Sequence, residues 1–116
     1  MIKSKRTYDA IGDDDGYRIL IDRLWPRGLS TEKAHIDLWM KDIAPSTELR
    51  KWYNHDTTRW HEFKTKYIEE LTHNKHLVKQ IHDIEKEYKT VTLLYSAKDT
   101  EHANIKVLME ILRKEE

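Results

Sequence analysis

The 116-residue sequence contains no cysteine, only three glycines and only two prolines. The absence of cysteine excludes disulfide bonds, thiolate metal ligands and a cysteine nucleophile, and it is compatible with a reducing compartment. With so few glycines the chain has no glycine-rich phosphate loop, and no serine stands in a nucleophile-elbow motif. The usual sequence signatures of nucleotide-binding folds and serine hydrolases are therefore missing, and we expect no cofactor.

Long apolar runs and an excess of one charge sign are also missing. No stretch approaches the roughly 20 apolar residues of a membrane-spanning helix, and the amino terminus has no apolar run of signal-peptide length. We therefore expect a cytoplasmic protein that does not enter a membrane. Lys and Arg number 21, as do Asp and Glu, so the chain lacks the basic excess that drives nonspecific nucleic-acid binding. A local basic pocket for a small anion is compatible with this balance.

The pattern of apolar residues predicts a small α/β fold. Apolar, β-branched segments predict strands at residues 2–8, 17–24 and 90–96. Helical spacing and capping residues predict helices at 31–34, from Ser46 to Tyr53, from Asp56 or Thr57 to Leu71, from Asn74 to Tyr88 and from Asp99 or Thr100 to Leu112. The two helices around Asn74 are expected to form a hairpin. We expect a single domain over residues 1–116, built as layers with a short, mostly parallel sheet flanked by helices.

The segment from Asp22 to Gly28 marks the end of an apolar strand. Pro26 cannot donate a ladder hydrogen bond and Gly28 permits a sharp turn, so the strand at 17–24 should end near its last residue. Arg23 and Arg27 then lie around a bend, where each guanidinium needs an acceptor. That acceptor is either a bound anion or a set of salt bridges to Asp22, Asp42 or Asp99. Trp25 is expected to form a pocket wall rather than a stacking platform.

A second group of polar residues follows the strand at 90–96. If the two strands are parallel neighbours, their carboxyl ends open at the same edge of the sheet, where open α/β folds bind ligands. Lys98 would then join Arg23 and Arg27, and a helix starting at Asp99 or Thr100 would add free amides that attract anions. Arg50 is expected to face water or the pocket entrance.

These residues divide into two candidate roles. Arg23, Trp25, Arg27 and Lys98 are the candidate ligand-binding residues, and Asp99 and His102 are the candidate acid and base. The structural alternatives are that Lys98 pairs with an adjacent Asp and that His102 lies on a helix surface without a functional role. Asp9 and Asp22 are further candidate acids, and a nucleophilic amine at Lys98 is the less favoured alternative.

Two other patterns resemble metal sites without completing one. The turn at 13–16 is rich in aspartate, but its spacing misses an EF-hand loop and the downstream glutamate is absent, so a solvated acidic turn is expected. His73 and His76 have ligand spacing, but no third ligand is evident. We therefore expect no metal.

Three motifs together resemble the DUF488 family, in its YeaO-like branch. They are Asp22–Gly28 (Asp-Arg-Leu-Trp-Pro-Arg-Gly), Asp42–Ser46 (Asp-Ile-Ala-Pro-Ser) and Leu94–Asp99 (Leu-Tyr-Ser-Ala-Lys-Asp). The resemblance covers nearly the whole chain and implies a compact bacterial or archaeal α/β protein without an established reaction. It points to the six candidate residues named above. One departure is Ala103-Asn104, where the family pattern is expected to carry an Asn-His or Asn-Asn-like pair.

Two classes of function follow. The preferred one is a binding protein that holds a small phosphate- or carboxylate-bearing ligand through Arg23, Arg27 and Lys98. The alternative is an enzyme acting on such a metabolite, with Asp99 or His102 moving a proton. A nucleic-acid partner ranks third because of the neutral charge balance.

Overall fold

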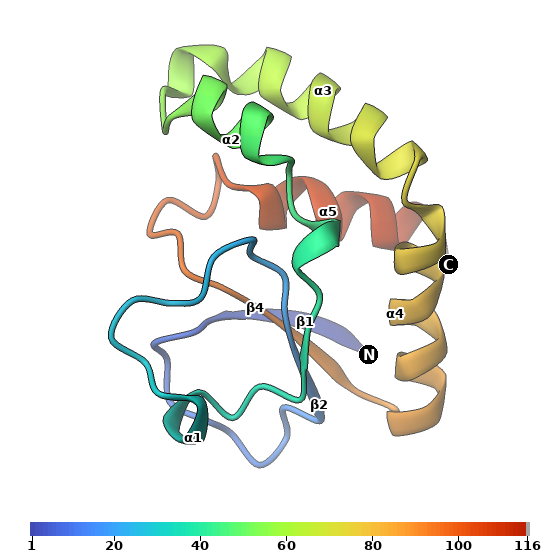
Figure 1. Ribbon diagram of the computed structural model, residues 1–116. Helices are drawn as coiled ribbons and strands as arrows, with labels where there is room; N and C mark the ends of the chain where they lie inside the picture. The colour runs from blue at the N-terminus through green and yellow to red at the C-terminus, as the bar shows by residue number, and fades with distance from the viewer. Residues whose placement is uncertain (116) are drawn as a thin grey trace.

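A computed structural model describes residues 1–115, and its centre is a four-stranded sheet (Figure 1). The strands are β1 (Ile2–Arg6), β2 (Tyr17–Leu20), β3 (Leu38–Trp39) and β4 (Val91–Tyr95), in the spatial order β1-β4-β2-β3. Every neighbouring pair is parallel, and Ile19 of β2 lies opposite Leu93 of β4. The predicted α/β class and the parallel pairing of the second and last strands are confirmed.

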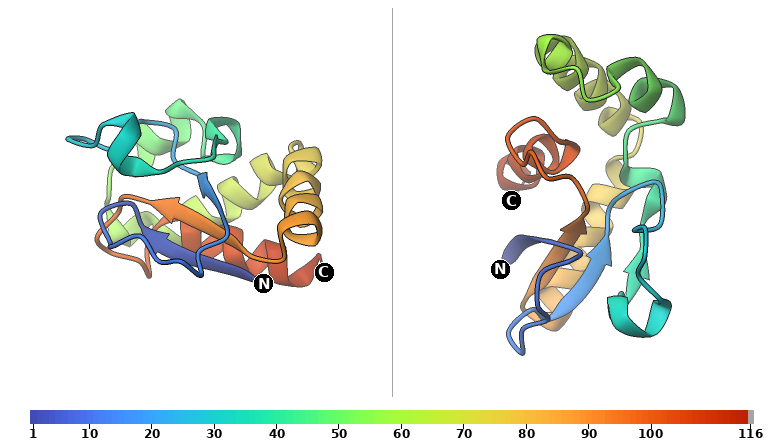
Figure 2. Two further views of the ribbon diagram at one scale, coloured as in Figure 1. Left: turned by 90° about the horizontal axis from the view of Figure 1, so that it is seen from below. Right: turned by 90° about the vertical axis from the view of Figure 1, so that its left-hand side faces the viewer.

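Five α-helices and two short 3-10 turns connect and cover the strands. The helices are α1 (Thr31–Ala34), α2 (Thr47–Tyr53), α3 (Trp60–Thr72), α4 (Lys75–Tyr88) and α5 (Asn104–Lys114), and the turns are η1 (Lys41–Ile43) and η2 (Thr57–Arg59). Figure 2 shows that α2 and α3 lie beyond the carboxyl ends of the strands. Ser46 caps α2 as predicted, because its hydroxyl accepts a hydrogen bond from the amide of Leu49. Ser30 caps α1 in the same way, through the amide of Lys33.

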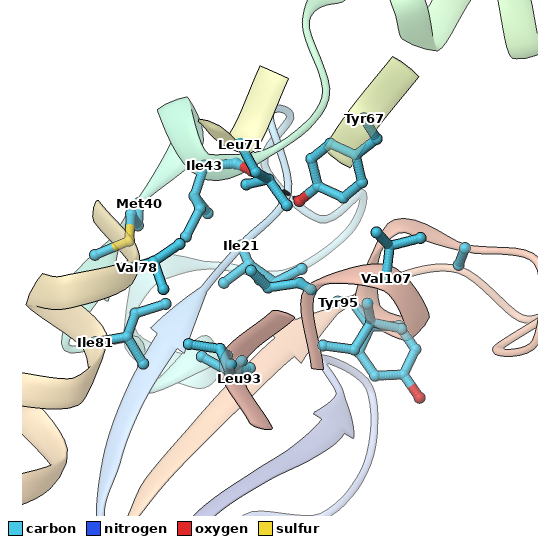
Figure 3. Packing of buried hydrophobic residues seen from close by; sticks show 14 of the residues in the cluster. Ile21, Met40, Ile43, Tyr67, Leu71, Val78, Ile81, Leu93, Tyr95 and Val107 are labelled. Atoms are coloured by element: carbon cyan, nitrogen blue, oxygen red, sulfur yellow. Dashed lines mark hydrogen bonds between the residues drawn. The ribbon is translucent and has the colours of Figure 1, made fainter. Parts of the chain in front are cut away.

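The hydrophobic core lies between one face of the sheet and the three long helices (Figure 3). Each helix contributes the apolar stripe that its spacing predicts: Phe63, Tyr67 and Leu71 from α3; Val78 and Ile81 from α4; Ile105, Leu108 and Leu112 from α5. The Tyr67 hydroxyl donates to the carbonyl oxygen of Ile43 over 2.8 Å, so the one polar atom of this ring is satisfied inside the core.

The limits of β1, β2 and α5 differ from the sequence prediction, and one strand was not predicted. β1 ends at Arg6 rather than Tyr8. β2 ends at Leu20 rather than near Leu24, because the Asp22 side chain accepts the Ser96 amide and replaces further ladder pairing. α5 begins at Asn104, because the Asp99 carboxylate closes a separate turn. β3 was not predicted, since its two residues become a strand only by pairing with β2.

The prediction that α3 and α4 form a helical hairpin is also wrong. Figure 1 shows α4 turning away from α3 instead of folding back along it. Asn74 does interrupt the two helices, since it lies between the end of α3 and the start of α4.

The acidic turn is not the solvated turn that its composition predicts. Asp13 and Asp14 are exposed, but Asp15 is buried at 1% exposure. Its carboxylate accepts from Lys5 over 2.9 Å, from the Gly12 amide over 3.1 Å and from the buried guanidinium of Arg18. Asp15 is therefore the shared acidic partner of cations from β1 and β2 on this side of the sheet.

No helix within residues 1–115 has both the length and the apolar character needed to cross a membrane.

Candidate functional site

A cleft of about 610 Å³ opens at the carboxyl ends of β2 and β4. Its walls come from the segments that follow these two strands, from α2 and from the start of α5. All six residues singled out by the sequence line it: Arg23, Trp25, Arg27, Lys98, Asp99 and His102. The parallel pairing of β2 and β4 brings these residues together, because both strands end at the same edge of the sheet.

The cleft segment that follows β2 is held in place by hydrogen bonds from other parts of the chain. The Trp39 indole donates to the Asp22 carbonyl over 2.7 Å, and the Tyr8 hydroxyl donates to the Arg27 carbonyl over 2.9 Å. The Trp25 indole closes the segment on itself by donating to the carbonyl of Leu29 over 2.6 Å. The backbone of the segment after β2 is therefore fixed by hydrogen bonds within the protein.

Arg23 serves mainly to join two loops. Its Nε donates to the Pro45 carbonyl over 3.0 Å and its Nη2 to the Ala44 carbonyl over 3.2 Å. Its Nη1 lies 3.5 Å from the Asp42 carboxylate, as the salt-bridge alternative predicts. Most of the donors of this guanidinium are thus occupied, and Arg23 has little capacity left for a ligand.

Three other cations in the cleft, unlike Arg23, have no partners within the protein's described residues. Arg27, Lys98 and Arg50 of α2 are exposed side chains that line the cleft. Among residues 1–115 none of the three makes a salt bridge within 4.0 Å or a side-chain hydrogen bond. Their donors are therefore available to an anion in the cleft.

Asp99 and His102 form a close pair beside these cations. The His102 Nδ1 lies 2.8 Å from one Asp99 oxygen, and the other oxygen accepts the amides of Glu101 and His102. The hydrogen bond with the imidazole is the main cause that lowers the pKa of Asp99 below its ordinary value. With the proton on Nδ1, Nε2 is the acceptor of the ring.

The imidazole of His102 is also positioned by two aromatic side chains. The Tyr53 hydroxyl donates to the backbone carbonyl of His102 over 2.8 Å. The Trp60 ring meets the imidazole edge to face, with 5.5 Å between ring centroids. α2 and α3 thus hold the turn that carries the Asp99–His102 pair.

Asp22 lies at the base of the cleft between the two strand ends. One of its oxygens accepts the Ser96 amide over 2.8 Å. Burial raises the pKa of this carboxyl, and hydrogen bonds from Ser96 and Asn104 oppose that rise. Asp22 therefore joins β2 to β4, and its contacts give it a structural task in addition to its place in the cleft wall.

Sequence reasoning missed several of the residues that line the cleft: Tyr8, His55 and Asn104. Tyr8 and His55 stand outside the motifs, and nothing in their local pattern marks them. The Asn104 side chain donates to the Ile21 carbonyl over 3.4 Å. Asn104 belongs to the Ala103-Asn104 pair, at which this sequence departs from the expected family pattern. Trp25 lines the cleft as expected and meets Trp39 edge to face.

The two patterns that resembled metal sites have other surroundings. Asp15 forms ion pairs with Lys5 and Arg18. His73 follows the last residue of α3, whereas His76 lies on α4. Within the part of the chain that the structure describes, no three His, Cys, Asp or Glu residues come together as a possible metal site.

Comparison with known proteins gives the family. The profile of a family described as "Inactive DUF488-N3 subclade" matches residues 1–116. The chain belongs to this family, DUF488-N3i. The resemblance to DUF488 proteins in the sequence motifs is thereby confirmed.

Relatives of this DUF488-N3i chain carry no assigned function in their names. The Uncharacterized protein YeaO of Escherichia coli (strain K12) is 44% identical over 112 residues, which span 97% of this chain and 96% of that protein. The Uncharacterized proteins Mb3100c of Mycobacterium bovis and Rv3073c of Mycobacterium tuberculosis are each 46% identical over 70 residues, or 60% of this chain and 59% of theirs. No solved structure matches the chain.

Proposed function

We propose that this DUF488-N3i protein binds a small ligand that carries a phosphate or carboxylate group, at the cleft beyond β2 and β4. The observation that carries the proposal is the set Arg27, Arg50 and Lys98. These three cations line one cleft and have no acidic partner within residues 1–115. Guanidinium and ammonium groups recognise phosphate and carboxylate through charge-assisted hydrogen bonds.

The balance of charge in the cleft supports the same proposal. Four permanent cations line it, against the carboxyl groups of Asp22 and Asp99. Asp22 already accepts the Ser96 amide, and Asp99 is already paired with His102. The cleft is therefore an electropositive site on a chain whose formal net charge is zero.

Binding without chemistry is favoured over catalysis by the family description, which contains the word "Inactive". The chain also has no cysteine to act as a nucleophile. A binding protein needs cations and a defined cleft wall, and the cleft has both. It does not need a group that transfers a proton.

The first test replaces a cation that has no role in the fold. Arg27→Ala should weaken binding of inorganic phosphate by about 10- to 100-fold, because a hydrogen bond to a charged group is lost. Isothermal titration calorimetry measures the affinity, and urea unfolding should show unchanged stability. Arg113→Ala, which removes an exposed arginine of α5 outside the cleft, is the matched control. Equal affinity in the Arg27 variant, or no binding of phosphate or acetate by the unmodified protein, would overturn the proposal.

The Asp99–His102 pair supports an acid–base enzyme as the second candidate. The 2.8 Å contact orients the imidazole, and a neutral ring with its proton on Nδ1 has Nε2 as a proton acceptor at the cleft. If this candidate is right, His102→Ala abolishes turnover of a phosphate or carboxylate ester while ligand binding persists, and Asp99→Asn reduces turnover. A panel of 4-nitrophenyl esters provides the assay. Turnover that survives in the His102 variant would remove this residue from any mechanism.

A further inference from the structure

The cleft presents apolar surface beside its cations, and the fold does not account for that surface. Leu24 lines the cleft with 58% of its surface exposed, and Tyr8 lines it with 45% exposed. Neither side chain belongs to the hydrophobic core. Exposed apolar groups gathered in a concave site are typical of ligand-binding grooves.

The Tyr8 ring is held in a fixed position by contacts with Arg27 and Arg6. Its hydroxyl donates to the Arg27 carbonyl, and the Arg6 guanidinium lies over the ring at 5.3 Å from the centroid. Arg6 is itself anchored, because it donates to the carbonyls of Ser96 and Ala97 over 3.0 and 3.1 Å. An aromatic side chain that is fixed in this way and still 45% exposed loses little entropy when a flat ligand packs against it.

The size of the cleft argues against a bare inorganic anion as its full occupant. A volume of about 610 Å³ falls within the roughly 300–1,000 Å³ of small-molecule sites. A phosphate ion held by Arg27 and Lys98 would leave most of this space to water in contact with Leu24, Pro26 and Pro45. Displacing that water with an apolar group is favourable.

We infer that the ligand is an aromatic phosphate or carboxylate, in which a flat apolar ring packs against Tyr8 and Leu24 while its anionic group meets Arg27, Arg50 and Lys98. This inference rests on the proposed function, since it assumes that the cations hold the anion. The ring supplies contact area, and the charge fixes its orientation in the cleft.

The test compares inorganic phosphate with phenyl phosphate by isothermal titration calorimetry. Phenyl phosphate should bind about tenfold tighter or better, and a tenfold difference corresponds to about 1.4 kcal/mol. Benzoate against acetate repeats the comparison for carboxylates and tells which anionic group is preferred. Cyclohexyl phosphate, which has a ring of similar size that is not flat, should gain less than phenyl phosphate.

A variant pair ties the preference to this wall of the cleft. Leu24→Asn should bring the ratio of phenyl phosphate to phosphate affinity close to one. Ile11→Asn should preserve that ratio, because Ile11 is similarly exposed at 48% but lies outside the cleft. If phosphate binds and phenyl phosphate binds no tighter, this inference fails and the proposed function stands. If neither phosphate nor phenyl phosphate binds, both fail.

Discussion

Replacing Asp15 by asparagine is expected to lower the free energy of unfolding by about 3–5 kcal/mol, the usual cost of removing one partner of a buried ion pair. Arg18 is only 4% exposed, and its guanidinium would lose its carboxylate. Lys5 would lose the same partner. The remaining contacts of Arg18 are the carbonyls of Ala34 and His35, which do not neutralise its charge. Urea unfolding followed by circular dichroism measures the difference.

Asp14→Asn is the matched control, since it makes the same chemical change one residue earlier. The Asp14 side chain is 88% exposed, and within residues 1–115 its one ion pair is with Lys3, over 3.2 Å. An exposed ion pair contributes about 0–1 kcal/mol, so this variant should unfold close to the unmodified protein. Similar losses of stability in the two variants would show that Asp15 does not act through its buried position.

The effect of Asp15 should also depend on pH in a defined direction. Burial is the largest influence and raises the pKa of this carboxyl, but hydrogen bonds from Lys5, the Gly12 amide and Arg18 outweigh it and hold the pKa at about 2. Because the folded value is below the ordinary 3.8, the stabilisation is complete above that value and is lost as pH falls toward 2. The stability difference between the unmodified protein and Asp15→Asn should therefore narrow between pH 4 and pH 2.

Gly16→Ala is expected to destabilise the fold by about 2–5 kcal/mol, from backbone strain together with a steric clash. Gly16 has a φ of +64°, and an added Cβ would lie 2.2 Å from the carbonyl oxygen of Thr90. That oxygen accepts the Tyr17 amide at the first contact between β2 and β4. Relief of the clash must therefore disturb the central pair of strands, and thermal or urea unfolding would measure the loss.

Gly28→Ala separates the clash from the strain. Gly28 also has a positive φ, +81°, but an added Cβ would meet no atom within 4 Å. Only the left-handed backbone penalty of about 1–2 kcal/mol applies there. An alanine at Gly16 that costs no more than one at Gly28 would contradict the close approach to Thr90.

The parts of the fold that depend on local chemistry were predictable from the sequence. Ser46 caps α2 with its own hydroxyl, and Phe63, Tyr67 and Leu71 lie on one face because of the helical repeat alone. The limits of β2 and α5 depended instead on distant partners. The Asp22 carboxylate ends β2 by accepting an amide 74 residues away, and no local pattern encodes that contact.

The candidate site shows the same division. The carboxyl ends of β2 and β4 could be placed together once parallel pairing was assumed, and this brought Arg27 and Lys98 to one edge. The hydrogen bonds that occupy the Arg23 guanidinium could not be predicted. Their acceptors are the backbone carbonyls of residues 44 and 45, and every residue carries a carbonyl. Tyr8 reached the cleft only through the path of the loop after β1.

The position of β4 in the sheet also sets the order in which the chain folds during its synthesis. Val91 lies opposite Ile2 on one side and Tyr17 on the other, so the last strand to be made sits between the two that are made first. Until residues 91–95 leave the ribosome, β1 lacks the strand it pairs with and β2 has only the two-residue β3. Such long-range pairing folds slowly and exposes unpaired strands. β1 carries the charges of Lys3, Lys5 and Arg6 at the edge of the sheet, and charged side chains disfavour the pairing of an edge strand with another chain.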